Sequence, residues 1–181
     1  VAAGESLPRN ETLYFNGQQW GAVKCWNPYS SDCNNAMALA AQDSSRVPMF
    51  ETAYLYNMLD GKQYPLLADG DFVWNDAQTE ITFKIKPAAK WSDGTPVTSK
   101  DVVFTFEGQM NNTKLPYNAS FVQFVDKVTA PDDQTVIVDF KIPAPRFAYE
   151  VLTLKFDTGI PIVPAHVLSA QADPNAFAGG L

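Results

Sequence analysis

Two stretches of the chain alternate between apolar and polar residues with the period of a half-buried β-strand. In residues 79–86 the alternation would place Ile81, Phe83 and Ile85 on one face. Residues 135–142 repeat the pattern, with one face formed by Val136, Val138, Phe140 and Ile142. Residues 131–133 read Pro-Asp-Asp, a turn signal, so we predict a hairpin from the segments on either side of them.

The apolar residues change to helical spacing in residues 99–110, where one face would carry Val102, Val103, Phe106 and Met110. Thr98 comes three residues before Asp101, which is close to a capping box and predicts the helix start. Asp93 and Gly94 predict a tight turn just ahead of this helix, because glycine accepts a positive φ.

Two further helices are predicted near the end of the chain. Residues 147–156 would form the first, after Pro145, with an inward face made by Phe147, Val151, Leu152 and Leu154. Residues 160–164 would be extended. Pro164 suits the first turn of a short helix over residues 165–170.

The remaining segments add short elements and one long loop. They predict a strand at 12–15, an irregular stretch at 18–35, a helical turn at 36–41 and a strand at 71–74. Residues 47–59 fit either a helix or a helix that runs into a strand. Together the elements predict an α+β fold, with a mostly antiparallel sheet and two to three packed helices over roughly residues 50–160.

Composition narrows the possible functions. The chain has 181 residues, 46% of them hydrophobic, and a net charge of −7 with scattered Lys and Arg. Nucleic-acid binding is excluded, because it needs clustered positive charge to displace counterions. No apolar run approaches the ~20 residues of a membrane-spanning helix. Residues 1–10 lack the apolar segment of a signal peptide, so we expect a mature or trimmed N-terminus.

Cys25 and Cys33 are the two cysteines of the chain. The chain has one histidine, which cannot complete a common zinc site with them. We therefore predict a disulfide that closes the loop between the two cysteines, in an oxidising compartment outside the cytoplasm. Two reduced structural cysteines are the alternative, because spacing alone does not prove a bond.

The other candidate side chains do not favour catalysis. Three aspartates could supply a carboxylate pair for glycoside hydrolysis: Asp69, Asp71 and Asp76. They lie in a charge-rich stretch that is typical of a solvated surface. His166 has no matching Ser or Cys pattern, so a structural role is favoured. Trp74 and Trp91 are interpreted as core or edge packing. We predict no catalytic residue, no metal site and no cofactor.

Residues 90–104, which read KWSDGTPVTSKDVVF, resemble the signature of the family 5 extracellular solute-binding proteins. This family contains the receptors of peptide, nickel and oligosaccharide ABC importers. Further segments resemble the family and occur in the same order along the chain. They are residues 50–53, 60–68, 130–136, 143–147, 162–168 and 172–177. The resemblance covers essentially residues 12–177. It implies part of a periplasmic-binding-protein-like type II fold, in which two lobes are joined by crossing segments.

Family members are several hundred residues long, so the resemblance implies that this chain is an N-terminal fragment. Residues 1–45 would hold a tail, the first strand of lobe one and a cleft loop. Residues 46–165 would form a small α+β domain. Residues 166–181 would begin the return towards lobe one.

The resemblance also implies a ligand site, because the family's loop after the first strand faces the cleft. The matching residues here are Gln18, Gln19 and Trp20. The same loop continues through Trp26, Asn27 and Tyr29. Tryptophan offers a flat apolar face to a sugar ring or a peptide side chain, and glutamine offers a donor and an acceptor. The alternative is that Trp20 and Trp26 only fill the junction between domains.

The implied function is that of the substrate-binding component of an ABC importer, which is not an enzyme. It would capture its ligand by hinge closure and deliver it to the membrane permease. The Gln-Gln-Trp-Gly run at 18–21 is more similar to the family's cello-oligosaccharide branch than to its peptide branch. An oligosaccharide is therefore the first ligand class, ahead of an oligopeptide and of nickel.

Two alternatives come from other classes of protein. One is an extracellular carbohydrate-active enzyme or its accessory module. The other is an interaction domain that binds a protein partner through the 16–35 loop. The importer role implies a location in the periplasm or on the outer face of the cell membrane, with or without a lipid anchor.

Overall fold

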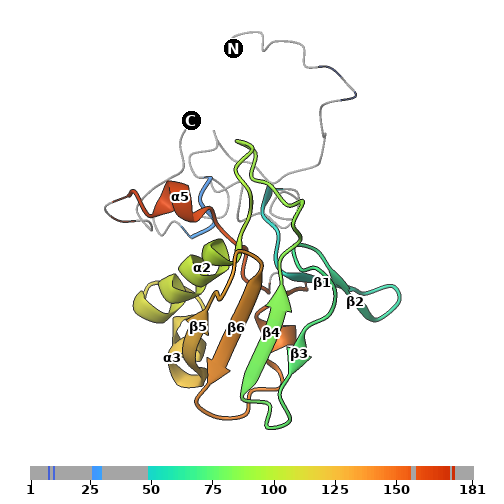
Figure 1. Ribbon diagram of the computed structural model, residues 1–181, viewed down its shortest axis with the longest axis vertical. Helices are drawn as coiled ribbons and strands as arrows, with labels where there is room; N and C mark the ends of the chain where they lie inside the picture. Colours follow the sequence, from blue (N-terminus) through green and yellow to red (C-terminus); the bar gives the residue numbers. More distant parts are fainter. Residues whose placement is uncertain are drawn as a thin grey trace, which may run out of the picture.

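The computed structural model describes residues 8, 10, 26–29, 49–155, 158–171 and 173, and their strands form two sheets (Figure 1). One sheet has the order β2-β1-β7 and contains β1 (Tyr54–Asn57), β2 (Lys62–Pro65) and β7 (Thr153–Leu154). The other has the order β3-β4-β6-β5 and contains β3 (Val73–Trp74), β4 (Glu80–Lys84), β5 (Val125–Thr129) and β6 (Thr135–Phe140). The β1–β7 pair is parallel and the other pairs are antiparallel, which confirms the predicted α+β class.

Strands β4 and β6 lie at the centre of the larger sheet, and their alternating pattern buries one face. Ile81 and Phe83 of β4 are fully buried and lie opposite Val138 and Val136 of β6. The predicted hairpin is confirmed, because β5 and β6 pair around the turn at 131–133. The prediction for Ile142 is wrong: β6 ends two residues earlier, and this side chain is 48% exposed.

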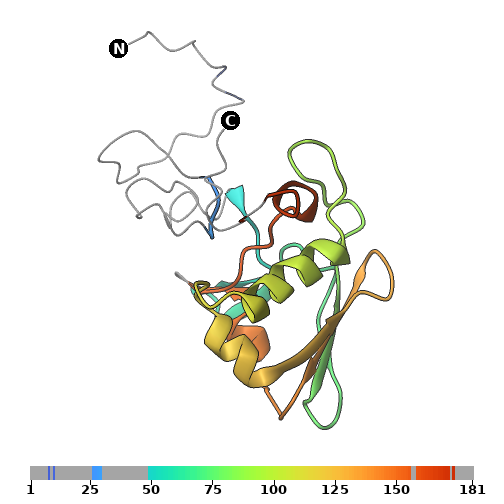
Figure 2. The same ribbon diagram turned by 90° about the vertical axis from the view of Figure 1, so that its left-hand side faces the viewer.

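The larger sheet is covered on one face by α2 (Ser99–Asn111) and α3 (Asn118–Phe124), as Figure 2 shows. The sequence predicts α2, and its inward residues Val102 and Phe106 are fully buried. It does not predict α3, whose short run of aromatic and β-branched residues fits a strand as well as a helix.

A cluster of phenylalanine rings holds the helices against the sheet. The Phe106 ring of α2 meets Phe121 of α3 edge-on, with 5.3 Å between the ring centroids. Phe147 lies 5.6 Å from Phe121 and 4.7 Å from Phe140 of β6 by the same measure. Such ring pairs contribute about 0.5–1.5 kcal/mol each beyond the area that they bury. The cluster is therefore the centre of the core.

The helix predicted at 147–156 is wrong in length. The helix α4 covers only Phe147–Glu150, and the chain then forms β7. Strand β7 pairs with β1, and the N–H of Tyr54 donates to the Leu152 carbonyl at 2.9 Å. Pairing with β1 satisfies backbone groups that a longer helix would have satisfied internally. The predicted inward side chains are nonetheless buried: Phe147, Val151, Leu152 and Leu154.

Residues 160–163 form the predicted extended connector, which is buried along its length. The N–H of Ile162 donates to the Glu51 carbonyl at 3.0 Å, so the connector runs beside the segment that leads into β1. Pro164 then caps α5 (Ala165–Leu168), which is two residues shorter than predicted. In the segment 47–59, whose spacing fits two interpretations, residues 54–57 form strand β1.

Some predictions fall outside the described residues, including the strand at 12–15 and the helical turn at 36–41. The division into 1–45, 46–165 and 166–181 stays a prediction. Within the described ranges, no helix has the length and apolar character needed to cross a membrane.

Candidate functional site

The turn at residues 91–95 is fixed by its own hydrogen bonds. Gly94 has a φ of 87°, and Oδ1 of Asp93 accepts the N–H of Thr95 at 2.8 Å. On the other side, Oδ2 of Asp93 lies 2.7 Å from Nε2 of His166 in α5. The Thr95 N–H, followed by His166, lowers the pKa of Asp93 from 3.8 to about 2. His166 thus has the structural role that the sequence favours, as a tie between this turn and α5.

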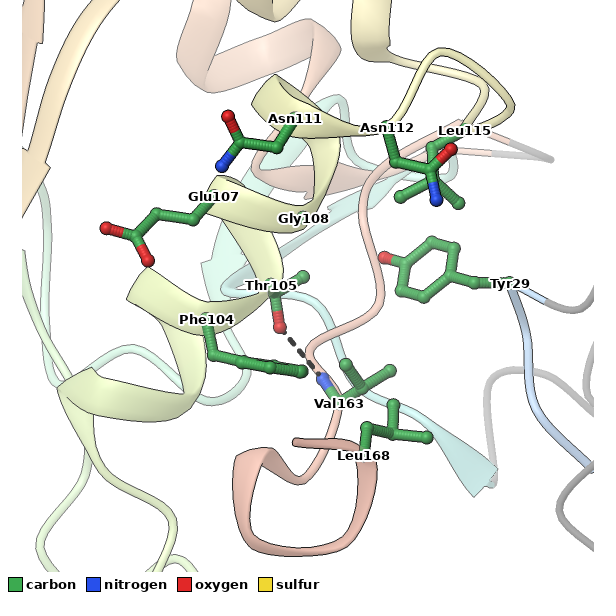
Figure 3. A pocket seen from close by; sticks show the side chains of 10 residues that line it. All are labelled: Tyr29, Phe104, Thr105, Glu107, Gly108, Asn111, Asn112, Leu115, Val163 and Leu168. Carbon is green, nitrogen blue, oxygen red and sulfur yellow. Dashed lines mark hydrogen bonds between the residues drawn. The ribbon is translucent and has the colours of Figure 1, made fainter. Parts of the chain in front are cut away.

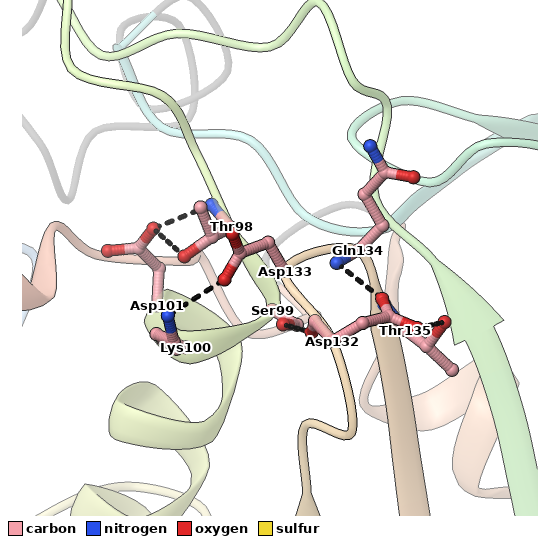
Figure 4. Close-up of polar contacts among 8 residues, drawn as sticks. All are labelled: Thr98, Ser99, Lys100, Asp101, Asp132, Asp133, Gln134 and Thr135. Carbon is pink, nitrogen blue, oxygen red and sulfur yellow. Dashed lines mark hydrogen bonds and ion pairs between the residues drawn. The ribbon is translucent and has the colours of Figure 1, made fainter.

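The start of α2 is held by a polar network (Figure 4). Oδ2 of Asp101 accepts the N–H of Thr98 at 2.8 Å, which is the predicted reciprocal cap. Oδ1 of Asp101 accepts the N–H of Ala165 at 2.9 Å, so one carboxylate joins α2 to α5. Asp101 is only 5% exposed, and both of its oxygens are engaged in holding the fold.

The same network reaches the β5–β6 turn. Ser99 donates through its hydroxyl to the Asp132 carbonyl and through its N–H to the Asp133 carbonyl, the latter at 2.9 Å. Oδ1 of Asp132 accepts the N–H groups of Gln134 and Thr135, which lowers the pKa of the Asp132 carboxyl. These contacts make residues 91–101 a scaffold that joins two helices to a hairpin.

Three of the five predicted ligand contacts, Gln18, Gln19 and Trp20, lie outside the described residues, as do Cys25 and Cys33. Trp26 is half-buried and Asn27 is 5% exposed. Oδ1 of Asn27 accepts the N–H of Tyr29 at 2.9 Å, so Asn27 fixes a local turn. A ligand contact for Trp26 or Asn27 stays a prediction.

Tyr29 joins this N-terminal turn to the rest of the fold and borders a hollow of about 410 Å³. Its hydroxyl donates to the Pro161 carbonyl of the connector at 2.6 Å. Figure 3 shows the hollow between Tyr29, the outer face of α2 and the connector. Its lining is mainly apolar: Tyr29, Phe104, Gly108, Leu115, Val163 and Leu168.

The sequence analysis does not identify this hollow. The available signal was Gly108, an isolated glycine inside a helical pattern, which often has a packing or functional reason. The rest of the lining comes from other residues of α2, the N-terminal turn, the loop after α2 and the chain around α5, and only the fold brings these together.

The other candidates behave as structural residues. Trp74 packs on Phe140 with 5.5 Å between ring centroids, and Trp91 is half-buried against the core, which confirms the packing interpretation of both. The three aspartates considered for catalysis are all exposed: Asp69, Asp71 and Asp76.

A second hollow of about 330 Å³ lies between α3 and α4 and includes Ser120.

Comparison with known proteins places this scaffold in a family. Residues 62–178 match the profile of the bacterial extracellular solute-binding proteins, family 5 middle. The chain is 30% identical to the periplasmic oligopeptide-binding protein OppA of Escherichia coli, over 89% of this chain and 31% of OppA. It is 37% identical to the peptidoglycan-binding protein YepA of Agrobacterium fabrum, over 63% of this chain and 17% of YepA.

A solved structure gives the same result. The mannohexaose-bound periplasmic oligopeptide-binding protein of Thermotoga maritima superposes with a TM-score of 0.69 and 26% identity, over 92% of this chain and 28% of that protein. The chain therefore spans about a third or less of the length of these relatives. The resemblance found at residues 90–104 is confirmed, and the described fold is part of a type II periplasmic-binding-protein fold. The chain belongs to the bacterial extracellular solute-binding proteins of family 5.

Proposed function

We propose that this chain is part of the substrate-binding receptor of an ABC importer and acts outside the cytoplasmic membrane. The observation that carries the proposal is the family match over residues 62–178, which covers the scaffold built around α2 and the β5–β6 hairpin. The receptor holds its ligand without making or breaking a bond and delivers it to a permease. Hinge closure between two lobes would give the permease a bound form to recognise.

The first ligand class in this proposal is an oligopeptide. OppA is named for oligopeptide binding and matches 89% of this chain, and YepA is named for peptidoglycan, which carries both peptide and sugar. This order differs from the one that the sequence analysis favoured. An oligosaccharide is the second candidate, supported by the mannohexaose bound to the Thermotoga relative.

The proposed ligand contacts are Gln18, Gln19, Trp20, Trp26 and Asn27. Supporting this assignment, the turn that contains Trp26 and Asn27 docks on the connector through Tyr29. A turn anchored in this way holds Trp26 and Asn27 in place, and preorganised contacts bind more tightly than mobile ones. We further propose that Cys25 and Cys33 form a disulfide that closes this loop.

The ligand class is tested by tryptophan fluorescence on the protein at its natural length. A mixed oligopeptide pool and a series of β-1,4- and mannose-based oligosaccharides are titrated separately. The expected result is a saturable change with one of the two classes, and a loss of about tenfold or more in affinity for Trp20→Ala. Trp74→Phe is the matched control, because Trp74 packs on Phe140 in the core, and it should leave the dissociation constant unchanged.

Two results would count against the proposal. Saturation by neither class would contradict the receptor role. An unchanged affinity in Trp20→Ala, with a clear signal in the parent protein, would remove the 18–27 loop from the ligand site and leave the receptor role standing.

A further inference from the structure

The hollow beside Tyr29 contains a glycine that the fold does not require. Gly108 lies inside α2, where glycine is less favourable than alanine because it loses more backbone freedom on folding. Its φ is not among the positive values found in this chain. A methyl group at position 108 would meet Leu115 Cδ1 at 3.9 Å, which is an ordinary contact. An alanine would therefore fit and would strengthen the helix.

Because Gly108 has no side chain, it leaves open space in the hollow. Figure 3 shows Gly108 on the part of α2 that borders the hollow, with Tyr29 and Leu115 to one side and Glu107 and Asn111 to the other. A larger side chain at position 108 would project into the hollow. Its volume of about 410 Å³ falls within the ~300–1,000 Å³ of small-molecule sites, which are typically apolar with a few polar groups.

The polar groups of the hollow indicate what it would accept. Glu107 and Asn111 are exposed and lie one helical turn apart, so their side chains are neighbours. Neither side chain makes a hydrogen bond or ion pair with the described part of the chain. Among the described residues that line the hollow, Glu107 is charged and none is a lysine, arginine or histidine. The site thus combines an apolar floor with an acidic rim.

We propose that this hollow at α2 and the connector is a further binding site, for a small molecule with an apolar or aromatic body and a cationic amino group. The body lies against Phe104, Val163 and Leu168, above the space that Gly108 leaves open. The amino group faces the Glu107 carboxylate, with the Asn111 amide oxygen as a further acceptor. The proposal goes beyond the importer role and does not depend on it.

The probe for this site is 4-fluorophenylalaninamide, which carries an aromatic ring and an ammonium group. Its binding to the protein at its natural length is followed by fluorine NMR. The expected result is saturable binding, with at least a tenfold loss in Gly108→Leu, because the leucine side chain fills the hollow. The N-acetylated probe has no cation and should bind several-fold more weakly.

Two further variants keep the test decisive. Ser120→Leu places the same side chain in the hollow between α3 and α4 and should leave binding unchanged. Glu107→Lys changes an exposed residue, so the protein should fold, and it should weaken binding several-fold.

Absence of saturable binding would overturn the site. So would undiminished binding to a Gly108→Leu protein whose unfolding midpoint matches that of the parent. Undiminished binding to Glu107→Lys would overturn the cationic ligand class.

Discussion

Gly159 is a residue where the backbone permits no side chain. Its φ is +93°, and a Cβ atom built there would lie 2.6 Å from the Thr153 carbonyl oxygen and 2.9 Å from its carbon. Both neighbours are backbone atoms of β7, which is paired with β1 and cannot move aside cheaply. The glycine therefore lets the connector pass close to the edge of the smaller sheet.

We predict that Gly159→Ala destabilises the protein by about 3 kcal/mol or more, because it adds a backbone clash to the strain of a positive φ. Gly70→Ala is the matched control, since Gly70 has a φ of +82° with no atom within 4 Å of the added Cβ. Gly70→Ala should lower the free energy of unfolding only by the strain of the positive φ, which is about 1 kcal/mol. Urea unfolding of both variants measures the difference, and equal costs would show that the close approach at Gly159 is unimportant.

Asp93 gives a prediction for acid pH. Its pKa is about 2 in the folded protein, below its ordinary value of 3.8, chiefly because of the Thr95 N–H and then His166. A lowered pKa means that the group stabilises the fold above pH 4 and loses this contribution as the pH falls towards 2. We predict that Asp93→Asn flattens the fall of stability between pH 4 and 2, and that His166→Gln flattens it less.

Urea midpoints measured at several pH values between 5 and 2 give these slopes. Parallel curves for the parent protein and Asp93→Asn would contradict the assignment. A flattening by His166→Gln of more than half that caused by Asp93→Asn would contradict the order of the two causes.

At the scale of elements, the Asp101 carboxylate connects the start of α2 with the start of α5. Its two oxygens accept one backbone N–H from each helix region, at 2.8 Å and 2.9 Å. The carboxylate is buried and the two N–H groups are partly buried, so its loss would leave two donors with restricted access to water.

We predict that Asp101→Ala destabilises the protein by about 2–4 kcal/mol, because two partly buried N–H groups lose their acceptors. Asp101→Asn keeps one acceptor oxygen and should cost about half as much. Urea unfolding at pH 7 tests this. An Asp101→Ala variant within about 0.5 kcal/mol of the parent would show that the carboxylate does not hold the two helices together.

The individual strands and helices differ in how well the sequence alone could predict them. Strands β4 and β6 were predictable, because each buries one face and the period of two is clear in residues 81–85 and 136–140. Helix α2 was predictable from its spacing and from the Thr98–Asp101 cap. Strand β7 was not, because its pairing with β1 is a contact between residues about a hundred positions apart, and it overrides a local helical pattern.

The candidate site was less predictable than the fold, for the same physical reason. The Asp93–His166 contact and the Tyr29–Pro161 contact each join distant parts of the chain. No local pattern encodes such contacts. The hollow beside Gly108 likewise exists only once Tyr29, α2 and the connector come together. Family resemblance could identify the scaffold, and only the structure shows which of its surfaces are open.

At the scale of the whole molecule, the described part of the chain is a stable platform. Its two sheets, its phenylalanine cluster and the contacts between residues 91–101 and α5 hold its elements together. The turn at 26–29 is docked on this platform through Tyr29. This arrangement suits a receptor, in which a rigid base positions a ligand-contacting loop.

The most direct test of the receptor role is calorimetric titration of the protein at its natural length with the oligopeptide pool and the oligosaccharide series, followed by mass spectrometry of the recovered ligand. We predict saturable binding of one ligand per protein, with the ligand recovered unchanged. Conversion of the ligand would contradict the account and favour a carbohydrate-active or other enzyme. Absence of binding by both classes would contradict it as well.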